Sequence, residues 1–179
     1  MRFWIALLAC GLLVLPALAF AERISGTAGD DRLVGTPLGD SIRGLGGDDT
    51  ILGKRGEDAL YGNAGRDRIE GGPNADGMWG GSGPDRLLGG GGFDFMEGEG
   101  GNDRLYGGSG PDTLYGLGGR DVLKGNGGPD RLLSGDDNVR DVLDGGGGRD
   151  VCYALRQDRV RNCEQVFNHG GPRDPTPPR

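Results

Sequence analysis

The sequence predicts an all-β fold in which short strands stack into a solenoid, and three observations predict this fold class. An aspartate recurs at every ninth position from Asp31 to Asp130, and twice more after a short insertion. An apolar residue or cysteine stands two positions after each aspartate, and a glycine stands five positions before nearly every one. A repeat this short cannot bury an apolar face alone, so the repeats must stack on their neighbours.

Residues 1–21 have the features of a secretory signal peptide. Arg2 gives a positive start, residues 3–15 are almost wholly apolar, and residues 19–21 (Ala-Phe-Ala) form the small-x-small pattern of a cleavage site. The alternative is a lipoprotein signal ending at Cys10, which would leave a very short apolar run before the cysteine. No other stretch approaches the roughly 20 apolar residues of a membrane span. We therefore expect a secreted mature chain, extracellular or periplasmic, that begins at Glu22 and has no membrane span.

Each nonapeptide is expected to form one glycine-rich loop and one short strand, and the roll is expected to cover residues 22–153. In residues 107–115, Gly-Gly-Ser-Gly-Pro-Asp-Thr-Leu-Tyr, the aspartate is at position 6 and the apolar residue at position 8. Glycines at positions 1 and 4 are expected to take positive φ and to turn their carbonyls inward. Positions 7 to 9 form the strand, so that position 8 points into the core and its neighbours point to solvent.

The pattern Gly-Gly-x-Gly-x-Asp-x-apolar-x resembles the RTX nonapeptide of hemolysin-type calcium-binding proteins. The resemblance covers about residues 26–152. It implies a parallel β-roll, a right-handed β-helix-like solenoid in which two repeats make one turn. It also implies that the aspartates at position 6 are metal ligands. These are Asp31, Asp40, Asp49, Asp58, Asp67, Asp76, Asp85, Asp94, Asp103, Asp112, Asp121, Asp130, Asp141 and Asp150.

Carboxylate and carbonyl oxygens are hard ligands that suit Ca²⁺, and we expect several ions, on the order of ten if all loops are filled. Leu38 and Asn74 replace the glycine at position 4, so the loops before Asp40 and Asp76 are expected to bind weakly or not at all. Aspartates two repeats apart lie on successive turns, separated by about 4.8 Å, where unneutralised carboxylates repel. Only 34% of the residues are hydrophobic, which is thin for a core. We therefore predict a chain that is largely disordered without calcium and β-rich with it.

The open end of a stack requires a cap, because its last turn exposes core and strand edges. Removal of the signal leaves Cys152 and Cys163, and two cysteines in an exported chain most often form a disulfide. The alternative is two free thiols. We expect residues 154–168 to form a cap tied by this disulfide, and the Pro-rich tail, residues 169–179, to be disordered.

The two faces of the roll are expected to differ. Position 9 of alternate repeats places Tyr61, Trp79 and Tyr115 in register on one sheet, interrupted by Glu97. Position 7 of the other sheet carries Arg32, Arg68, Arg86 and Arg104. One interpretation is that aromatic rings and arginine stems cover the strand backbone. The other is that the Tyr61, Trp79 and Tyr115 face binds a glycan or a partner protein.

Composition and residue types exclude several functions. A net charge of −7 makes the chain a poor partner for nucleic acids. The sole histidine, His169, lies in the tail, and no catalytic triad, zinc cluster or phosphate-binding loop is present in the sequence. We therefore predict a non-enzymatic, exported calcium-binding repeat protein that folds on Ca²⁺. The alternatives are an adhesin or matrix scaffold stiffened by calcium and, further from the pattern, a calcium module of an epimerase or hydrolase.

Overall fold

The computed structural model describes residues 21–135 and 137–169. These residues form 17 strands and no helix, so the described part of the chain has no helix that could cross a membrane. One sheet holds β1 (Arg23–Ser25), β3 (Ser41–Gly46), β5 (Ala59–Ala64), β7 (Gly77–Ser82), β9 (Phe95–Gly100), β11 (Thr113–Gly118), β13 (Arg131–Leu133), β15 (Val151–Leu155) and β17 (Gln165–His169). The other holds β2 (Arg32–Val34), β4 (Thr50–Leu52), β6 (Arg68–Gly72), β8 (Arg86–Gly91), β10 (Arg104–Ser109), β12 (Val122–Gly127), β14 (Val142–Gly147) and β16 (Arg159–Arg161).

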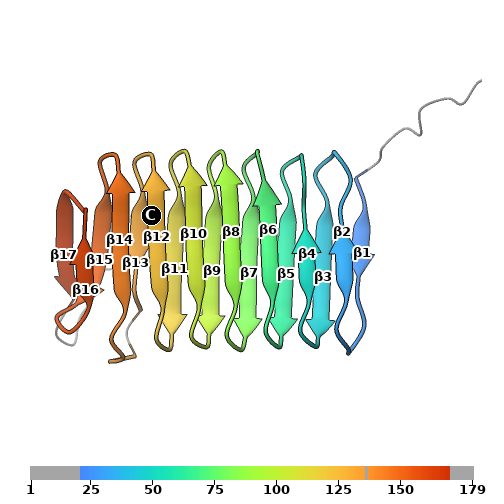
Figure 1. Cartoon of the computed structure of the whole chain (residues 1–179), viewed down its shortest axis with the longest axis horizontal. Coiled ribbons are helices and arrows are strands. Elements are labelled where there is room, and N and C mark those ends of the chain that lie inside the picture. The colour runs from blue at the N-terminus through green and yellow to red at the C-terminus, as the bar shows by residue number, and fades with distance from the viewer. Residues whose placement is uncertain (1–20, 136, 170–179) are drawn as a thin grey trace, which may run out of the picture.

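Successive strands alternate between the two sheets, so the chain coils as a solenoid with two strands per turn (Figure 1). Within each sheet all neighbours are parallel, and over most of the roll the partners are separated by two repeats, as in the pairing of Ile42 with Leu60. Figure 1 shows the strands of one sheet running opposite to those of the other. The sequence prediction of a parallel β-roll is confirmed.

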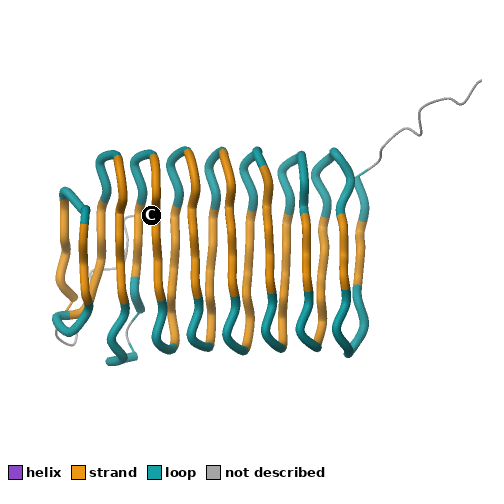
Figure 2. The backbone as a smooth tube through the Cα atoms, viewed as in Figure 1, coloured by secondary structure: helices purple, strands orange, loops and turns teal. Residues whose placement is uncertain are grey.

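The insertion after Asp130 lengthens one turn but does not change which side chains face inward. Leu123 pairs with Leu143, and Leu132 pairs with Cys152, so the separation between partners grows by the length of the insertion. The inserted segment lies in the connection between β13 and β14, which extends beyond the level of the other loops in Figure 2. A loop at the edge of a solenoid absorbs an insertion because its length does not affect the pairing of strands.

The core is a double row of position 8 side chains, one from each strand. Every member of the predicted row from Ile42 to Cys152 is completely buried, and Leu33 is partly buried at the N-terminal end. Position 8 faces inward because alternate side chains of a strand point to opposite sides of the sheet. The completely buried set is Ile42, Ile51, Leu60, Ile69, Met78, Leu87, Met96, Leu105, Leu114, Leu123, Leu132, Leu143, Cys152 and the additional Ala154.

The C-terminal segment is a further coil of the same solenoid with shorter loops. Leu143 pairs with Val160 and Cys152 pairs with Val166, so partners are closer in sequence here than in the rest of the roll. The Cys152–Cys163 disulfide is present, with the two Cα atoms 6.0 Å apart, and ties β15 to the segment after β16. His169 belongs to β17, whereas the sequence analysis assigned it to the tail. Residues 170–179, and residues 1–20 of the predicted signal peptide, lie outside the described part of the chain.

Candidate metal sites

The position 6 aspartates form two ladders, one along each edge of the roll where the loops lie. The backbone N–H of every one of these aspartates except Asp150 donates a hydrogen bond to Oδ1 of an aspartate one turn further along the chain. The Asp40 N–H donates to Asp58 at 2.7 Å, and the Asp103 N–H donates to Asp121 at 2.8 Å. The carboxylates from Asp40 to Asp150 are buried, with at most 4% of the residue exposed. Successive coils are therefore linked through a carboxyl oxygen at every turn, and these hydrogen bonds are strongest when the carboxyl group is ionised.

The second carboxylate oxygen has no hydrogen-bond partner in twelve of these loops. A buried acceptor without a partner costs free energy, and a buried negative charge without one costs more. A cation or a proton bound to each of these oxygens would remove that cost. The twelve oxygens are Oδ2 of Asp49, Asp58, Asp67, Asp76, Asp85, Asp94, Asp103, Asp112, Asp121, Asp130, Asp141 and Asp150.

Burial raises the pKa of these carboxyl groups above the ordinary value of 3.8. The pKa of Asp103 is raised to about 8, mainly by burial and further by the charges of Asp121 and Asp85, against the lowering effect of the Asp85 N–H. Burial likewise raises the pKa of Asp85 and of Asp130 to about 7. The protein environment alone therefore does not stabilise the ionised form of these groups.

Glycine at position 1 makes room for the carboxylate. A Cβ added to Gly80 would lie 2.6 Å from Oδ2 of Asp85 and 2.8 Å from the carbonyl oxygen of Gly98 on the next turn. Position 1 glycines do not take positive φ, so that part of the sequence prediction is wrong. Positive φ occurs at position 4, as expected for Gly47 (φ 99°), and at position 2, as for Leu45 (φ 84°). The sequence analysis did not predict positive φ at position 2. Several loops carry leucine, lysine or glutamate there, and these residue types do not indicate positive φ as glycine does.

The first two loops differ from the other twelve. At position 2 they carry Thr27 and Thr36, which do not take positive φ, a conformation that β-branched side chains rarely adopt. The Thr27 N–H instead donates to Oδ2 of Asp31 at 2.6 Å, and the Thr27 hydroxyl donates to the same oxygen at 2.9 Å. Thr36 makes the corresponding bonds to Asp40 at 2.6 and 3.1 Å. In these loops the protein itself supplies partners for the second oxygen.

The C-terminal ends of both ladders are also completed by protein groups. Asp158 accepts the Asp141 N–H on Oδ1 at 3.0 Å and the Leu155 N–H on Oδ2 at 2.7 Å. Glu164 accepts the Asp150 N–H on Oε2 at 2.6 Å. The sequence analysis included both carboxylates in the cap but did not identify them as the ends of the ladders. In the sequence, the only indication of this role was that each of these acidic residues lies close to the position where the next aspartate of its ladder would be expected.

The twelve loops with an unpartnered oxygen fit a divalent cation bound mainly by backbone. No group of three or more acidic, cysteine or histidine side chains that could hold a metal lies together among the described residues, so each ion would take one or two carboxylates and several carbonyl oxygens. The loop before Asp76, predicted to be weak, has the same unpartnered oxygen as its neighbours. There Asn74 accepts the Gly56 N–H through Oδ1 at 3.1 Å. The loop before Asp40 differs because of Thr36.

The aromatic face is continuous, whereas the sequence predicted an interruption at Glu97. Tyr61 and Trp79 stack with ring centroids 4.7 Å apart, and Phe95 lies 6.1 Å from Trp79 and 5.5 Å from Tyr115. Phe95 was missed because it occupies position 7 rather than position 9 of its repeat.

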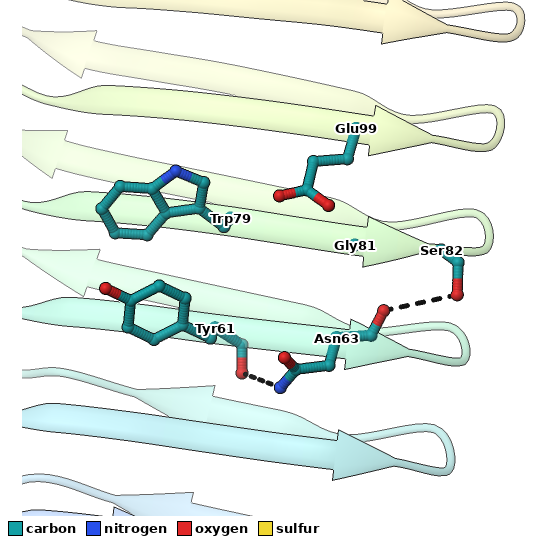
Figure 3. Close-up of a pocket in the computed structure, with 6 residues that line it drawn as sticks. All are labelled: Tyr61, Asn63, Trp79, Gly81, Ser82 and Glu99. Atoms are coloured by element: carbon teal, nitrogen blue, oxygen red, sulfur yellow. Dashed lines mark hydrogen bonds between the residues drawn. The ribbon is translucent and has the colours of Figure 1, made fainter.

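A shallow depression of about 280 Å³ lies beside Tyr61 and Trp79 (Figure 3). Its other walls are the polar side chains of Asn63, Ser82 and Glu99, together with Gly81. Aromatic carbon and hydrogen-bonding groups therefore meet on this face of the nine-stranded sheet.

Comparison with known proteins identifies the repeat. The profile of the RTX calcium-binding nonapeptide repeat matches residues 18–37, 25–60, 43–78, 52–87, 79–114, 106–139 and 140–159. No curated protein sequence matches the chain closely enough to count as a relative. The profile matches cover nearly the whole solenoid, including the loops that hold the unpartnered carboxylate oxygens. The chain therefore belongs to the family of RTX calcium-binding nonapeptide repeat proteins.

Proposed function

We propose that this chain is an exported, non-enzymatic calcium-binding protein whose roll folds when Ca²⁺ binds. One observation carries the proposal: twelve buried aspartate oxygens have no partner in the protein. A cation that binds them removes the cost of burying the charge and adds its own attraction to the carboxylate. Because the unfolded chain does not preform these loops, the binding free energy contributes directly to folding.

The ligands are proposed to be the carboxylates with an unpartnered oxygen, from Asp49 to Asp150. Asp31 and Asp40, which the sequence pattern alone includes, are proposed to bind no ion, since Thr27 and Thr36 already occupy their second oxygens. When bound, calcium supplies positive charge between coils that would otherwise repel. The repeat pattern includes fourteen aspartates as ligands and expects weak loops before Asp40 and Asp76, whereas the hydrogen bonds favour twelve metal-binding carboxylates, with Asp31 and Asp40 left out.

Circular dichroism and calorimetry test this function. The purified mature chain in excess EGTA is expected to give a mostly disordered spectrum, and millimolar CaCl₂ is expected to convert it to a β-rich one. Magnesium at the same concentration serves as the control, because its strict octahedral geometry suits flexible backbone sites poorly. An unchanged β-rich spectrum with and without calcium, or no heat of calcium binding, would contradict the proposal.

Export depends on residues 1–21 and has a separate test. N-terminal sequencing of the protein from culture medium and periplasm is expected to begin at Glu22. An uncleaved chain that stays with the cells would contradict cleavage after Ala21. A lipid-modified chain that begins at Cys10 would favour the lipoprotein alternative.

A second candidate function is a calcium-stiffened scaffold, an adhesin or matrix component, that binds a glycan through the Tyr61–Trp79–Tyr115 face. The depression beside Tyr61 and Trp79 favours it, because its polar walls provide hydrogen-bonding groups for hydroxyls next to aromatic carbon. Trp79→Ala is expected to abolish binding on a glycan array, while Tyr106→Ala, on the opposite sheet, is expected to leave it intact. If Trp79→Ala binds the array as the parent does, this face serves only to cover the strands.

A further inference from the structure

The outer surface of the eight-stranded sheet carries arginines on three adjacent strands. Arg68 on β6, Arg86 on β8 and Arg104 on β10 are register partners, and all three are exposed. Arg66, also exposed, lies in the loop just before β6. We call these four residues the arginine row. Because β6, β8 and β10 are neighbours in Figure 1, the row follows the long axis of the roll.

Three of the four arginines make no ion pair with a described residue. Arg68 pairs with Glu70, and the Arg86 guanidinium lies 5.3 Å from the centre of the Tyr106 ring. Among the described residues, no ion pair involves Arg66, Arg86 or Arg104. Like charges on directly paired strands repel, and an anion that lies against them relieves this repulsion.

The arginine row borders a shallow depression of about 590 Å³. Its other lining residues are Thr50, Pro84 and four aspartates. Asp49, Asp67 and Asp85 are buried carboxylates of one ladder, and Asp48 is exposed. In the proposed function these three carboxylates hold calcium, and the present inference rests on that function. Once calcium has neutralised them, the four arginines of the depression outnumber its one remaining carboxylate, Asp48.

We propose that the arginine row is the docking surface for a linear acidic polysaccharide, one that carries carboxylate or sulfate groups along its length. A chain lying along the roll would meet one guanidinium per strand, about every 4.8 Å. The guanidinium fork pairs with such planar or tetrahedral oxyanions through two hydrogen bonds. Single-stranded nucleic acid would require free aromatic faces for its bases. On this surface Arg86 and Lys124 both lie over the ring of Tyr106.

Binding to three dextrans that share one backbone tests the inference. Neutral dextran, carboxymethyl dextran and dextran sulfate are immobilised, and the calcium-loaded protein is passed over each. The protein is expected to bind at least one acidic dextran at least about tenfold more tightly than neutral dextran, and added NaCl is expected to weaken binding by screening. The acidic dextran that binds more tightly identifies the preferred group. Equal binding to all three would overturn the proposal.

Two matched variants separate the arginine row from net charge. Arg86→Gln/Arg104→Gln is expected to lose about tenfold or more in affinity for the acidic dextran. Arg55→Gln/Arg149→Gln removes the same charge from exposed loops at the opposite edge and is expected to bind as the parent does. Equal losses in both variants would overturn the proposal, as would equally tight binding of a single-stranded oligonucleotide through the same arginines.

Calcium-induced folding is measured on the same samples. A protein that takes up calcium and becomes β-rich but ignores acidic dextrans refutes only the docking surface. A protein that takes up no calcium refutes the proposed function itself.

Discussion

The first two loops and the twelve that follow carry an aspartate at the same position, but the second oxygen of its carboxylate has different surroundings in the two groups. In the first two, the N–H and hydroxyl of Thr27 or Thr36 bind the second carboxylate oxygen. In the other twelve, position 2 is glycine, asparagine or another residue held in positive φ, and the oxygen has no partner. The comparison shows that the aspartate alone does not define a metal site. The residue at position 2 of the loop decides whether the protein bonds the second carboxylate oxygen or leaves it without a partner.

The C-terminal end supports the same distinction. Asp158 has both oxygens bonded to backbone N–H groups, as Asp31 and Asp40 have their second oxygens bonded by threonine. The loops with an unpartnered carboxylate oxygen therefore lie between two ends whose carboxylates are bonded by protein groups. Terminal repeats of a solenoid commonly differ from the inner ones, because they lack a neighbour on one side.

The largest expected effect is that of pH on the calcium-free protein. Burial raises the pKa of Asp67 to about 6 and that of Asp103 to about 8 in the folded roll. Because the folded pKa values exceed the unfolded ones, this stabilisation is complete below about pH 4 and is lost as the pH rises through about 6 to 8. In EGTA, β structure is therefore expected to increase on acidification, as measured by circular dichroism.

With calcium the dependence is expected to reverse, because calcium binds the ionised carboxylates and its binding releases protons. Folding in calcium should therefore strengthen as the pH rises from about 5 to 8. A calcium-free protein whose β content is the same at both ends of this range would show that the inner loops do not need a cation or a proton.

The next effect concerns single aspartates. Asp103→Asn replaces the unpartnered oxygen with an amide, which repels a cation, and is expected to remove one bound calcium and about 2–3 kcal/mol of stability in calcium. Asp31→Asn is the matched change in a threonine loop. There the amide oxygen can still accept the Thr27 N–H, so an unchanged calcium number and a loss below about 1 kcal/mol are expected. Calorimetry and urea unfolding measure both, and equal calcium loss in the two variants would erase the proposed difference between loops.

Glycine at position 4 gives a smaller contrast. Gly47 has φ 99°, and an added Cβ would lie 2.6 Å from the Asp30 nitrogen, so Gly47→Ala is expected to cost about 1–3 kcal/mol. Gly29 occupies the same position in the first loop without positive φ, and the nearest atom to its added Cβ is 4.0 Å away. Gly29→Ala is expected to be neutral or to stabilise by up to about 1 kcal/mol. Thermal unfolding in calcium distinguishes them, and similar losses would mean that the two loops have the same conformation.

The smallest effect is that of the threonine hydroxyl. Thr36→Val keeps the β-branch and the N–H bond to Asp40 but loses the hydroxyl bond, and is expected to cost about 1 kcal/mol with no change in calcium number. Thr113→Val, at an outward strand position, is the control and is expected to change stability by less than about 0.5 kcal/mol. A gain of one calcium ion in Thr36→Val would show that the hydroxyl alone, rather than the backbone conformation, keeps the ion out.

The regular period predicted the core side chains from Leu33 to Cys152, and the resemblance to the RTX repeat added the parallel roll with two repeats per turn. Together they predicted the place of every aspartate in the two ladders. These features depend on spacing along the chain, because a strand of fixed length turns alternate side chains inward and a fixed period keeps successive turns in register. The Cys152–Cys163 disulfide was predicted from the sequence as well, from the two cysteines that remain once the signal is removed.

The tertiary structure decided which partner each carboxylate oxygen has. The positive φ of Leu45, the threonine bonds to Asp31 and Asp40, and the role of Glu164 depend on contacts between turns and on backbone conformation within each loop. Similarly, Phe95 completes the aromatic face because rings from positions 7 and 9 meet in space. A period specifies which residues are equivalent in sequence. Only the packed coils show where equivalent residues have different neighbours, because a buried polar atom is satisfied or left without a partner by its surroundings in three dimensions.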